Sequence, residues 1–325
     1  MSAPTGLATH RDLVGQAPAL LRVRDSIEKV ARAPRTTVLV TGETGTGKEL
    51  VARAIHARSA RQSRPFVAVN CSQSTPELFA SELFGHVPGA FTGALARGRA
   101  GLFATAEGGT LLLDEIGELA PTAQAQLLRV LQERTFRPVG GTSDLPMDVR
   151  IIAATHRDLP SLVSAGTFRE DLWYRLNVAA IHVPALRERR ADIPALVEHL
   201  LQRIARDHGI EPPGIAEDAL DGLARQSWPG TVRELAHTLE RAVIEAASAR
   251  LEVAHFRPAP DRKPPRSESG FTLDVEDLSL AAVERSLIAR VLTEAGGNRS
   301  RAARVLGVHR ATLHGKLRAR SCSAK

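Results

Sequence analysis

The chain has 325 residues, of which 43% are hydrophobic, so it is long enough for a large core and for two or three folded units. Its two cysteines, Cys71 and Cys322, suit neither a disulfide framework nor a metal site, and they favour a reducing, cytoplasmic location. No apolar run approaches the roughly 18 residues that span a bilayer. Residues 1–11 also lack the apolar block of a signal peptide. The composition therefore argues against a membrane or secreted protein.

The net charge of +7 is concentrated at one end of the chain. From residue 290 onward the chain has nine Lys and Arg residues and a single acid, Glu294. This segment therefore accounts for the net positive charge, and the rest of the chain is almost neutral. A neutral body with a basic tail indicates a polyanion partner at the C-terminal end. A solvated basic tail without a partner is the simpler alternative.

Short apolar runs alternate with helical patterns through the first part of the chain. The apolar runs cover residues 36–41, 66–69, 110–113, 149–154 and 180–183. Their almost continuous apolarity is typical of strands in a parallel sheet that is covered on both faces. The pattern predicts an α/β, doubly wound domain, in which ligands bind beyond the carboxyl ends of the strands.

After residue 187 the strand pattern gives way to amphipathic helices, which predicts a helical lid subdomain. A segment rich in proline and charge then follows at residues 257–270 and is typical of a linker. The predicted division is a short extension at 1–10, an α/β subdomain at 11–186, a lid at 187–255, a linker at 256–272 and a small helical domain at 273–321.

A glycine-rich loop follows the first predicted strand and has the pattern GxxxxGK. It comprises Gly42, Glu43, Thr44, Gly45, Thr46, Gly47 and Lys48. Backbone N–H groups of such a loop surround phosphates, the following helix N-terminus adds positive potential, and the lysine reaches the β- and γ-phosphates. Glu49 stands where Ser or Thr usually binds Mg²⁺. A chance glycine loop is the alternative, but the strand–loop–helix context favours ATP.

Polar side chains follow the other predicted strands. Asp114 and Glu115 end the third strand, where Asp114 would hold Mg²⁺ and Glu115 would polarise the attacking water. Asn70 follows the second strand and is expected to hydrogen-bond Glu115 when the γ-phosphate is absent. Thr155 and His156 follow the fourth strand and are expected to sense the γ-phosphate. Each of these residues alone could be an ordinary strand-end or helix cap.

Three arginines complete the predicted site. Arg169 and Arg175 flank residues 170–174, and Arg233 follows residues 228–232. Phosphoryl transfer gains from a cation on the developing charge, and a neighbouring subunit often supplies it. An arginine supplied by a neighbouring subunit would imply that the subunits assemble into a ring. Ordinary surface ion pairs are the alternative in a chain rich in arginine.

A second glycine-containing segment, GAFTGA, lies between the P-loop and the acid pair. It comprises Gly89, Ala90, Phe91, Thr92, Gly93 and Ala94. This composition forms a poor helix and a poor strand, so it is typical of a flexible loop that presents one aromatic side chain and one hydroxyl. From the residues alone, a loop without special function would be the better interpretation.

Taken together, these segments resemble the sigma-54-dependent transcription activators, the AAA+ enhancer-binding proteins of bacteria. The matching motifs, which extend the resemblance over nearly the whole chain, are Ser81–His86, Gly89–Ala94, Gly108–Glu115, Leu186–Arg189 and Trp228–Leu235. The Gly89–Ala94 hexapeptide is very specific to this family. Two departures are Val87-Pro88 in place of a more polar pair, and Thr231 in place of the usual Asn.

The resemblance implies an AAA+ ATPase that uses ATP and Mg²⁺, with a role for each matching residue. Lys48 and Glu49 lie in its Walker A loop, and Asp114 and Glu115 match its Walker B acids. Asn70 corresponds to its switch asparagine, and Thr155 to its sensor I position. Arg169 and Arg175 match the trans-acting arginine fingers, and Arg233 matches the sensor II arginine. Val14 and Gly15 lie where the adenine pocket forms, and the Gly89–Ala94 loop would contact the sigma-54 factor.

The tail is predicted to contain a helix-turn-helix. Residues 278–295 form an amphipathic pattern, Asn298 is a suitable N-cap for a helix at 299–306, and Gly307 precedes another helix at 309–318. This arrangement resembles a Fis-type DNA-binding domain. The residues expected to reach bases or phosphates are Arg299, Ser300, Arg301, His309, Arg310, Thr312, His314 and Lys316. A helical hairpin used only for dimerisation is the alternative.

The resemblance implies an activator that binds enhancer DNA, assembles into a hexameric ring and remodels the sigma-54 RNA polymerase holoenzyme with the energy of ATP. Two rivals remain: another AAA+ machine, and a DNA-binding regulator in which ATP controls only assembly. Only about ten residues precede the ATPase body, where family members often carry a regulatory domain. The sequence therefore predicts a protein without that domain, which is regulated in trans by its expression level or by an inhibitory protein.

Overall fold

A computed structural model describes residues 13–72, 76–90, 98–229, 231–246, 250–256, 280–296, 298–308, 311–313 and 316. The chain divides into two compact units, Met1–Arg257 and Pro258–Lys325, and each is described by itself. Among the described residues, no helix is long and apolar enough to cross a membrane.

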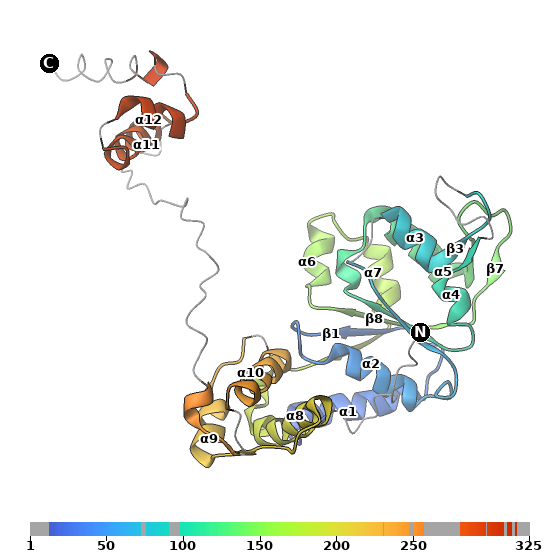
Figure 1. Ribbon diagram of the computed structural model, residues 1–325. Helices are drawn as coiled ribbons and strands as arrows, with labels where there is room; N and C mark the ends of the chain where they lie inside the picture. Colours follow the sequence, from blue (N-terminus) through green and yellow to red (C-terminus); the bar gives the residue numbers. More distant parts are fainter. Residues whose placement is uncertain are drawn as a thin grey trace. The chain divides into compact units, whose positions relative to one another are not determined.

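A five-stranded parallel sheet forms the centre of the first unit (Figure 1). Its order is β2-β5-β8-β1-β9, with every neighbouring pair parallel. The strands are β1 (Val38–Thr41), β2 (Phe66–Asn70), β5 (Thr110–Asp114), β8 (Arg150–Thr155) and β9 (Ala179–His182). The five predicted strands and the α/β fold class are confirmed, since each strand lies within a residue or two of its expected place.

Helices cover both faces of this sheet, because side chains on alternate strand positions point to opposite sides. Leu39, Leu111 and Ile151 pack on one face against α3, α4, α5 and α7, whereas Val38 and Ile152 pack on the other against α1 and α2. The helices are α1 (Pro18–Ala31), α2 (Lys48–Ala57), α3 (Pro76–Phe84), α4 (Leu102–Thr105), α5 (Pro121–Glu133), α6 (Leu159–Ser164) and α7 (Glu170–Leu176). Figure 1 shows α1 and α2 on the side of the sheet opposite to α3, α5, α6 and α7.

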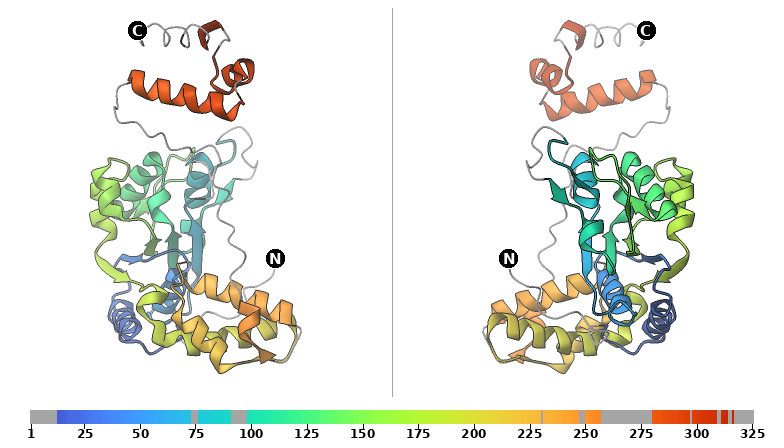
Figure 2. Two further views of the ribbon diagram at one scale, coloured as in Figure 1. Left: turned by 90° about the vertical axis from the view of Figure 1, so that its left-hand side faces the viewer. Right: turned by 90° about the vertical axis from the view of Figure 1, so that its right-hand side faces the viewer.

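A helical lid follows the sheet and has its own core. It contains α8 (Ile193–His208), α9 (Glu217–Arg225) and α10 (Thr231–Ala246). Short 3₁₀ helices at Leu186–Glu188, Arg190–Asp192 and Val253–Phe256 pack against them, whereas the one at Ile116–Glu118 follows β5. Buried Trp228 and Leu235 are part of the lid core, and the Trp228 indole N–H donates to the Leu223 carbonyl at 2.7 Å. Figure 2 shows the lid helices together at the end of the unit that carries α1.

The sequence did not predict three two-stranded pairs of two residues each. Two are antiparallel, β3 (Gly85–His86) with β4 (Arg99–Ala100) and β6 (Thr135–Phe136) with β7 (Leu145–Pro146). The third joins β10 (Gly214–Ile215) to β11 (Arg250–Leu251) in parallel, so the expectation that no strand occurs in the lid is wrong. Strands this short have too few residues to show a periodicity of two.

The second unit contains α11 (Leu280–Glu294) and α12 (Arg299–Val305). They share a small core of Ile288, Val291, Ala302, Ala303 and Leu313. The Asn298 side chain accepts a hydrogen bond from the Ser300 N–H at 3.1 Å, as an N-cap does. These two helices match the predicted start of a helix-turn-helix, and most of the helix expected at 309–318 lies outside the described residues.

A buried histidine gives the first unit a pH-dependent stability. His56 is fully buried, its Nδ1 lies 2.9 Å from the Thr110 hydroxyl, and burial lowers its pKa below the usual value near 6.5. Because the unfolded chain then binds this proton more readily than the native state, stability is full above about pH 6.5 and falls as the pH drops below it.

We expect the free energy of unfolding, measured with urea, to fall from pH 7.5 to pH 5.5. His56→Gln should lower stability at both pH values and make that fall shallower. His199→Gln, at a partly exposed histidine on α8, is the comparison variant that separates the loss of the buried histidine from the loss of any histidine. A fall that is the same in wild type and His56→Gln would contradict the assignment.

Candidate nucleotide site

The P-loop connects β1 to α2 and has the backbone needed to surround phosphates. Gly42 and Gly47 have φ angles of +148° and +101°, which side chains rarely allow. Lys48 is the first residue of α2 and is 93% buried, and its Nζ donates to the carbonyls of Gly42 and Glu43 at 3.0 and 3.3 Å. The ammonium is therefore held at the loop, at the N-terminus of a ten-residue helix.

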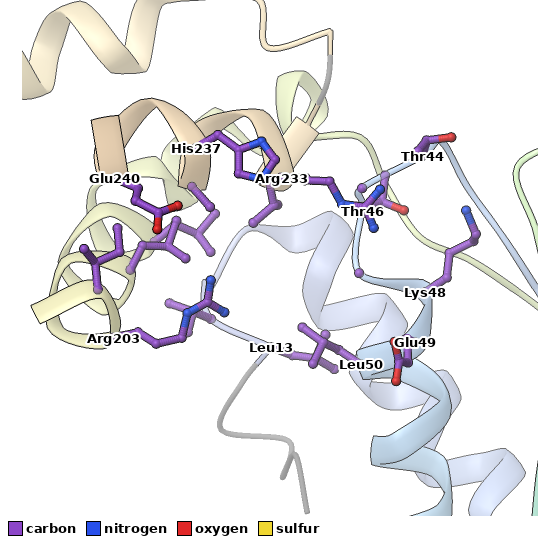
Figure 3. Close-up of a pocket in the computed structure, with 18 of the residues that line it drawn as sticks. Leu13, Thr44, Thr46, Lys48, Glu49, Leu50, Arg203, Arg233, His237 and Glu240 are labelled. Atoms are coloured by element: carbon purple, nitrogen blue, oxygen red, sulfur yellow. The ribbon is translucent and has the colours of Figure 1, made fainter. Parts of the chain in front are cut away.

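A cleft of about 570 Å³ extends from this loop to the lid. Its apolar lining comprises Leu13, Val14, Leu50, Leu196, Leu200, Ile204, Val232 and Ala236. Figure 3 shows Arg203 and Arg233 projecting from the lid helices into the space that faces Thr46 and Leu13. An apolar chamber next to a phosphate loop suits a flat base joined to a charged chain.

Two carboxylates close the phosphate end of the cleft. Asp114 ends β5, and burial together with the charge of Glu115 raises the pKa of its carboxyl. A buried carboxylate beside another one favours a bound cation, so the donor set fits Mg²⁺. Glu115 has a φ of +55°, a left-handed conformation that costs on the order of 1 kcal/mol or more and is typical of functional positions.

The neighbours of Glu115 differ from those predicted. Its Oε2 lies 2.6 Å from His156 Nδ1, and its Oε1 lies 3.7 Å from Lys48 Nζ. Asn70 sits opposite Asp114 in the sheet, but its Oδ1 accepts from the N–H and hydroxyl of Ser72 at 2.9 and 2.7 Å. The expected Asn70–Glu115 hydrogen bond is not among the contacts of the described residues, where the Asn70 amide oxygen instead accepts from Ser72.

Thr155 also lies differently from its predicted role. Its side chain is fully buried, and its Oγ1 accepts a hydrogen bond from the Arg157 N–H at 3.0 Å, beside Gly117. It does not line the cleft. At this strand end, His156 is the residue whose side chain contacts the Glu115 carboxylate.

The predicted arginines fall into two groups. Arg233 lines the cleft of its own chain, whereas Arg169 and Arg175 do not. Arg169 pairs with Asp171 at 2.7 Å, and that hydrogen bond raises the pKa of its guanidinium. Arg175 donates to the Leu131 carbonyl at 3.0 Å. Both sit at α7, away from the lining of their own cleft.

An acid just before the first lid helix, which was not predicted from the sequence, holds the N-terminal segment that lines one side of the cleft. Asp192 is buried, and its Oδ1 accepts from the N–H groups of Gln16 and Ala17 at 2.6 and 2.8 Å. A Cβ at Gly15 would overlap this carboxylate, so glycine is required there. Val14 lines the cleft, whereas Gly15 does not. The local sequence has no signal for these contacts, which span about 175 residues.

Three further contacts join residues between 187 and 231 to the P-loop. Arg187 forms a two-pronged ion pair with Glu43, which lowers the pKa of that carboxyl. The Thr231 hydroxyl donates to the Thr44 carbonyl at 2.8 Å, and buried Arg189 donates to the Thr46 carbonyl at 3.2 Å. Glu49, which also lines the cleft, pairs with Arg53 at 2.7 Å instead. The loop tip is therefore held by the lid as well as by its own strand and helix.

The other predicted contact residues are only partly described. Gly89 and Ala90 follow Val87-Pro88, and the Ala90 N–H donates to the Val87 carbonyl at 3.2 Å, while Phe91–Ala94 lie outside the described residues. In the second unit, Arg299, Ser300 and Arg301 begin α12, and Thr312 is exposed. Lys316 forms an ion pair with Glu284 of α11. The described part of the chain does not include His309, Arg310 or His314.

Family comparisons agree with this geometry. Residues 13–182 match the Sigma-54 interaction domain, residues 187–271 the AAA+ ATPase lid domain, and residues 279–319 the Fis family of bacterial regulatory proteins. The transcriptional regulatory protein ZraR of Salmonella typhimurium is 46% identical over 314 residues, which cover 97% of this chain and 70% of ZraR. The Nif-specific regulatory protein of Azotobacter vinelandii is 49% identical over 298 residues, or 91% of this chain and 56% of that protein.

Solved structures show the same fold. The NtrX structure from Brucella abortus in complex with ATP has a TM-score of 0.69 at 38% identity, covering 94% of this chain and 69% of NtrX. A RuvB variant from Thermotoga maritima, at 16% identity and a TM-score of 0.51, shares the fold alone. The AAA+ sigma-54 interaction domain implies ATPase activity. The chain belongs to the sigma-54-dependent transcriptional activators, with an AAA+ domain, a helical lid and a Fis-type helix-turn-helix.

Proposed function

We propose that this protein hydrolyses ATP in the cleft and uses the energy to remodel the sigma-54 RNA polymerase holoenzyme so that the promoter opens. The observation that carries the proposal is the convergence of Lys48, Asp114 and Glu115 on one cleft at the carboxyl edge of the sheet. These are the cation, the metal-binding acid and the water-polarising acid that phosphoryl transfer to water requires.

Each residue has a task that follows from its position. The P-loop N–H groups and Lys48 bind the phosphates, and the apolar chamber around Val14 and Ile204 takes the base. Asp114 would hold Mg²⁺, which neutralises phosphate charge when bound. Glu115 orients a water for attack and accepts its proton, while Arg233 reaches the phosphates from the lid.

The site is complete only in a ring, in which the cation for the transition state comes from the next subunit. Arg169 is about half exposed at the start of α7, and Tyr174 and Val178 nearby are 61% exposed. Exposed arginine, aromatic and aliphatic side chains close together in the sequence are consistent with a protein interface. A hexamer is plausible for this family, and it would place this face against a neighbour's cleft.

The remaining segments would contact the partners, sigma-54 and DNA. The Gly89–Ala94 loop would contact sigma-54, and it is anchored to the ATPase body through Gly85–His86, which pairs with β4 and bridges to Val139. The helix-turn-helix would bind enhancer DNA, with Arg299 and Arg301 at the start of α12 near phosphates. ATP turnover, loop contact and DNA binding thus occupy different parts of the chain.

Thr92→Ala tests the link between hydrolysis and promoter opening. We expect ATPase activity within about twofold of wild type, because Thr92 belongs to none of the motifs proposed to bind or hydrolyse ATP, but at least a tenfold loss of open complexes on a sigma-54 promoter in vitro. Enhancer binding, followed by gel shift, should be unchanged. Normal promoter opening by this variant would contradict the proposed role of the Gly89–Ala94 loop.

The rival in which ATP controls only assembly makes the opposite prediction for Glu115→Gln. If that variant opened promoters fully while bound to ATP, hydrolysis would not be needed, and remodelling would be ruled out. Wild-type protein that binds enhancer DNA yet opens no sigma-54 promoter with ATP would overturn the proposed function as a whole.

A further inference from the structure

We propose that Thr231 is a positioning residue that sets how tightly the cleft binds nucleotide, because its hydroxyl holds the tip of the P-loop in the shape that receives phosphates. The assignment, which rests on the proposed binding of ATP at the cleft, gives this hydroxyl a role in nucleotide affinity rather than in the stability of the fold.

Thr231 lies where the lid meets the P-loop. It is the first residue of α10 and is fully buried, and the two residues that follow it, Val232 and Arg233, line the cleft. Its Oγ1 donates to the carbonyl of Thr44 at 2.8 Å, across 187 residues of sequence. Thr44 also lines the cleft, and Figure 3 shows it on the loop, with Arg233 on α10. One hydroxyl therefore connects the helix that carries Arg233 to the loop that would surround the phosphates.

The other two contacts between this part of the chain and the loop differ in kind. The side chains of Arg187 and Glu43 are 42% and 45% exposed, and an exposed ion pair contributes little. Arg189 donates to the Thr46 carbonyl at 3.2 Å from a segment that precedes α8. Thr231 makes the shorter of the two hydrogen bonds to loop carbonyls, and it does so from α10 itself. We therefore expect the loss of its hydroxyl to free the loop tip more than the loss of the ion pair would.

The backbone of Thr231 indicates that its place is imposed by its surroundings. Its φ is +62°, a left-handed conformation that a β-branched residue rarely adopts. Its N–H donates to the Trp228 carbonyl at 3.0 Å, and Trp228 is itself buried in the lid core with a φ of +48°. A residue stays in such a conformation only where its neighbours determine it, and such positions cluster at functional sites. The turn after Trp228 thus directs the Thr231 hydroxyl at the loop at a cost in backbone strain.

A loop tip that is already held favours binding. The N–H groups of the loop have to converge on phosphate oxygens, and a loop that has this shape in the free protein loses less conformational entropy when the phosphates arrive. ATP and ADP both carry the β-phosphate, so the contribution applies to both nucleotides. Removing the hydroxyl should therefore weaken the binding of each and raise KM for ATP, with a much smaller effect on kcat.

Three substitutions in the full-length protein separate the hydroxyl from the strained backbone. Thr231→Val removes the hydroxyl and keeps the strain, Thr231→Gly removes both, and Thr231→Asn supplies an amide donor and tolerates the left-handed conformation. The first two should weaken the binding of Mg²⁺-ATPγS and of Mg²⁺-ADP, measured by calorimetry, by about fivefold, as expected for the loss of one hydrogen bond. The third should bind both nucleotides within about twofold of wild type.

Thermal unfolding of the same proteins without nucleotide distinguishes affinity from stability. Thr231→Gly relieves the strain, so its midpoint should be at least that of wild type although its nucleotide affinity falls. Thr105→Val is the matched control, because the Thr105 hydroxyl also donates to a carbonyl, that of Gly101 at 3.1 Å, but does not line the cleft. This control should leave both affinities within about twofold of wild type.

Two results would overturn the assignment: wild-type affinity in Thr231→Val, or affinities that follow the unfolding midpoint across the three variants. Wild-type protein that binds both nucleotides but hydrolyses no ATP would contradict the proposed function, and the binding comparison would still decide the role of Thr231. Wild-type protein that binds neither nucleotide would overturn both proposals.

Discussion

Glu115→Gln is expected to lower kcat for ATP hydrolysis by about 10²- to 10⁴-fold while ATP binding is retained. The amide keeps the size of the side chain but is far less basic, so it cannot accept the proton of the attacking water. The substitution leaves in place Lys48 and the P-loop, the groups proposed to bind the β- and γ-phosphates. Steady-state hydrolysis and equilibrium binding of ATP measure the two effects separately.

Glu118→Gln is the control for this experiment. Glu118 lies three residues further on, in the adjacent 3₁₀ turn, and pairs with Arg157 at 3.1 Å without lining the cleft. Its loss should change kcat by less than about twofold, as expected of an exposed ion pair. If Glu115→Gln retained more than a tenth of wild-type kcat, another group would have to be the base.

Arg169→Ala and Arg175→Ala are each expected to lower kcat by about 10³-fold, and mixing subunits should restore activity. Lys48→Ala subunits cannot bind phosphates productively, but they carry both arginines. In a mixed ring with Arg169→Ala subunits, the intact arginine of one chain would complete the intact cleft of the other. Hydrolysis by the mixture should therefore exceed that of either variant alone.

Arg129→Ala is the matched control for the arginines. Arg129 lies on α5, which packs against α7, and it is exposed and paired with Glu133 at 3.0 Å. It should hydrolyse ATP at the wild-type rate. If mixing gave only the average of the two inactive proteins, Arg169 and Arg175 would act within their own chain or only on structure.

Much of the fold could be predicted because its signals are local. The apolar runs that form β1, β5 and β8 are almost continuous, which parallel strands buried on both faces require. Helix α5 begins at Pro121, a residue favoured in the first turn of a helix. The P-loop and the acid pair were found for the same reason, since each occupies a few consecutive residues directly after a strand.

The parts of the site that could not be predicted depend on distant residues. Sequence places Asn70 and His156 equally well at strand ends, and only the structure shows that Ser72 occupies one and Glu115 contacts the other. Thr231 is similar: its φ of +62° explains why asparagine, which tolerates this conformation, is usual there. A threonine at this position still donates to Thr44, which no local pattern reveals.

The contacts between the P-loop tip and the lid limit which segments of this protein can be exchanged for those of related proteins. Glu43, Thr44 and Thr46 each contact a partner between residues 187 and 231, so the boundary near residue 186 separates two segments that share one structural unit. A chimera that takes its lid from another activator would have to exchange both sides of these contacts together. Breakpoints within the segment 257–270 cut none of these contacts, so exchange of the DNA-binding unit is the simpler route to new promoter targets.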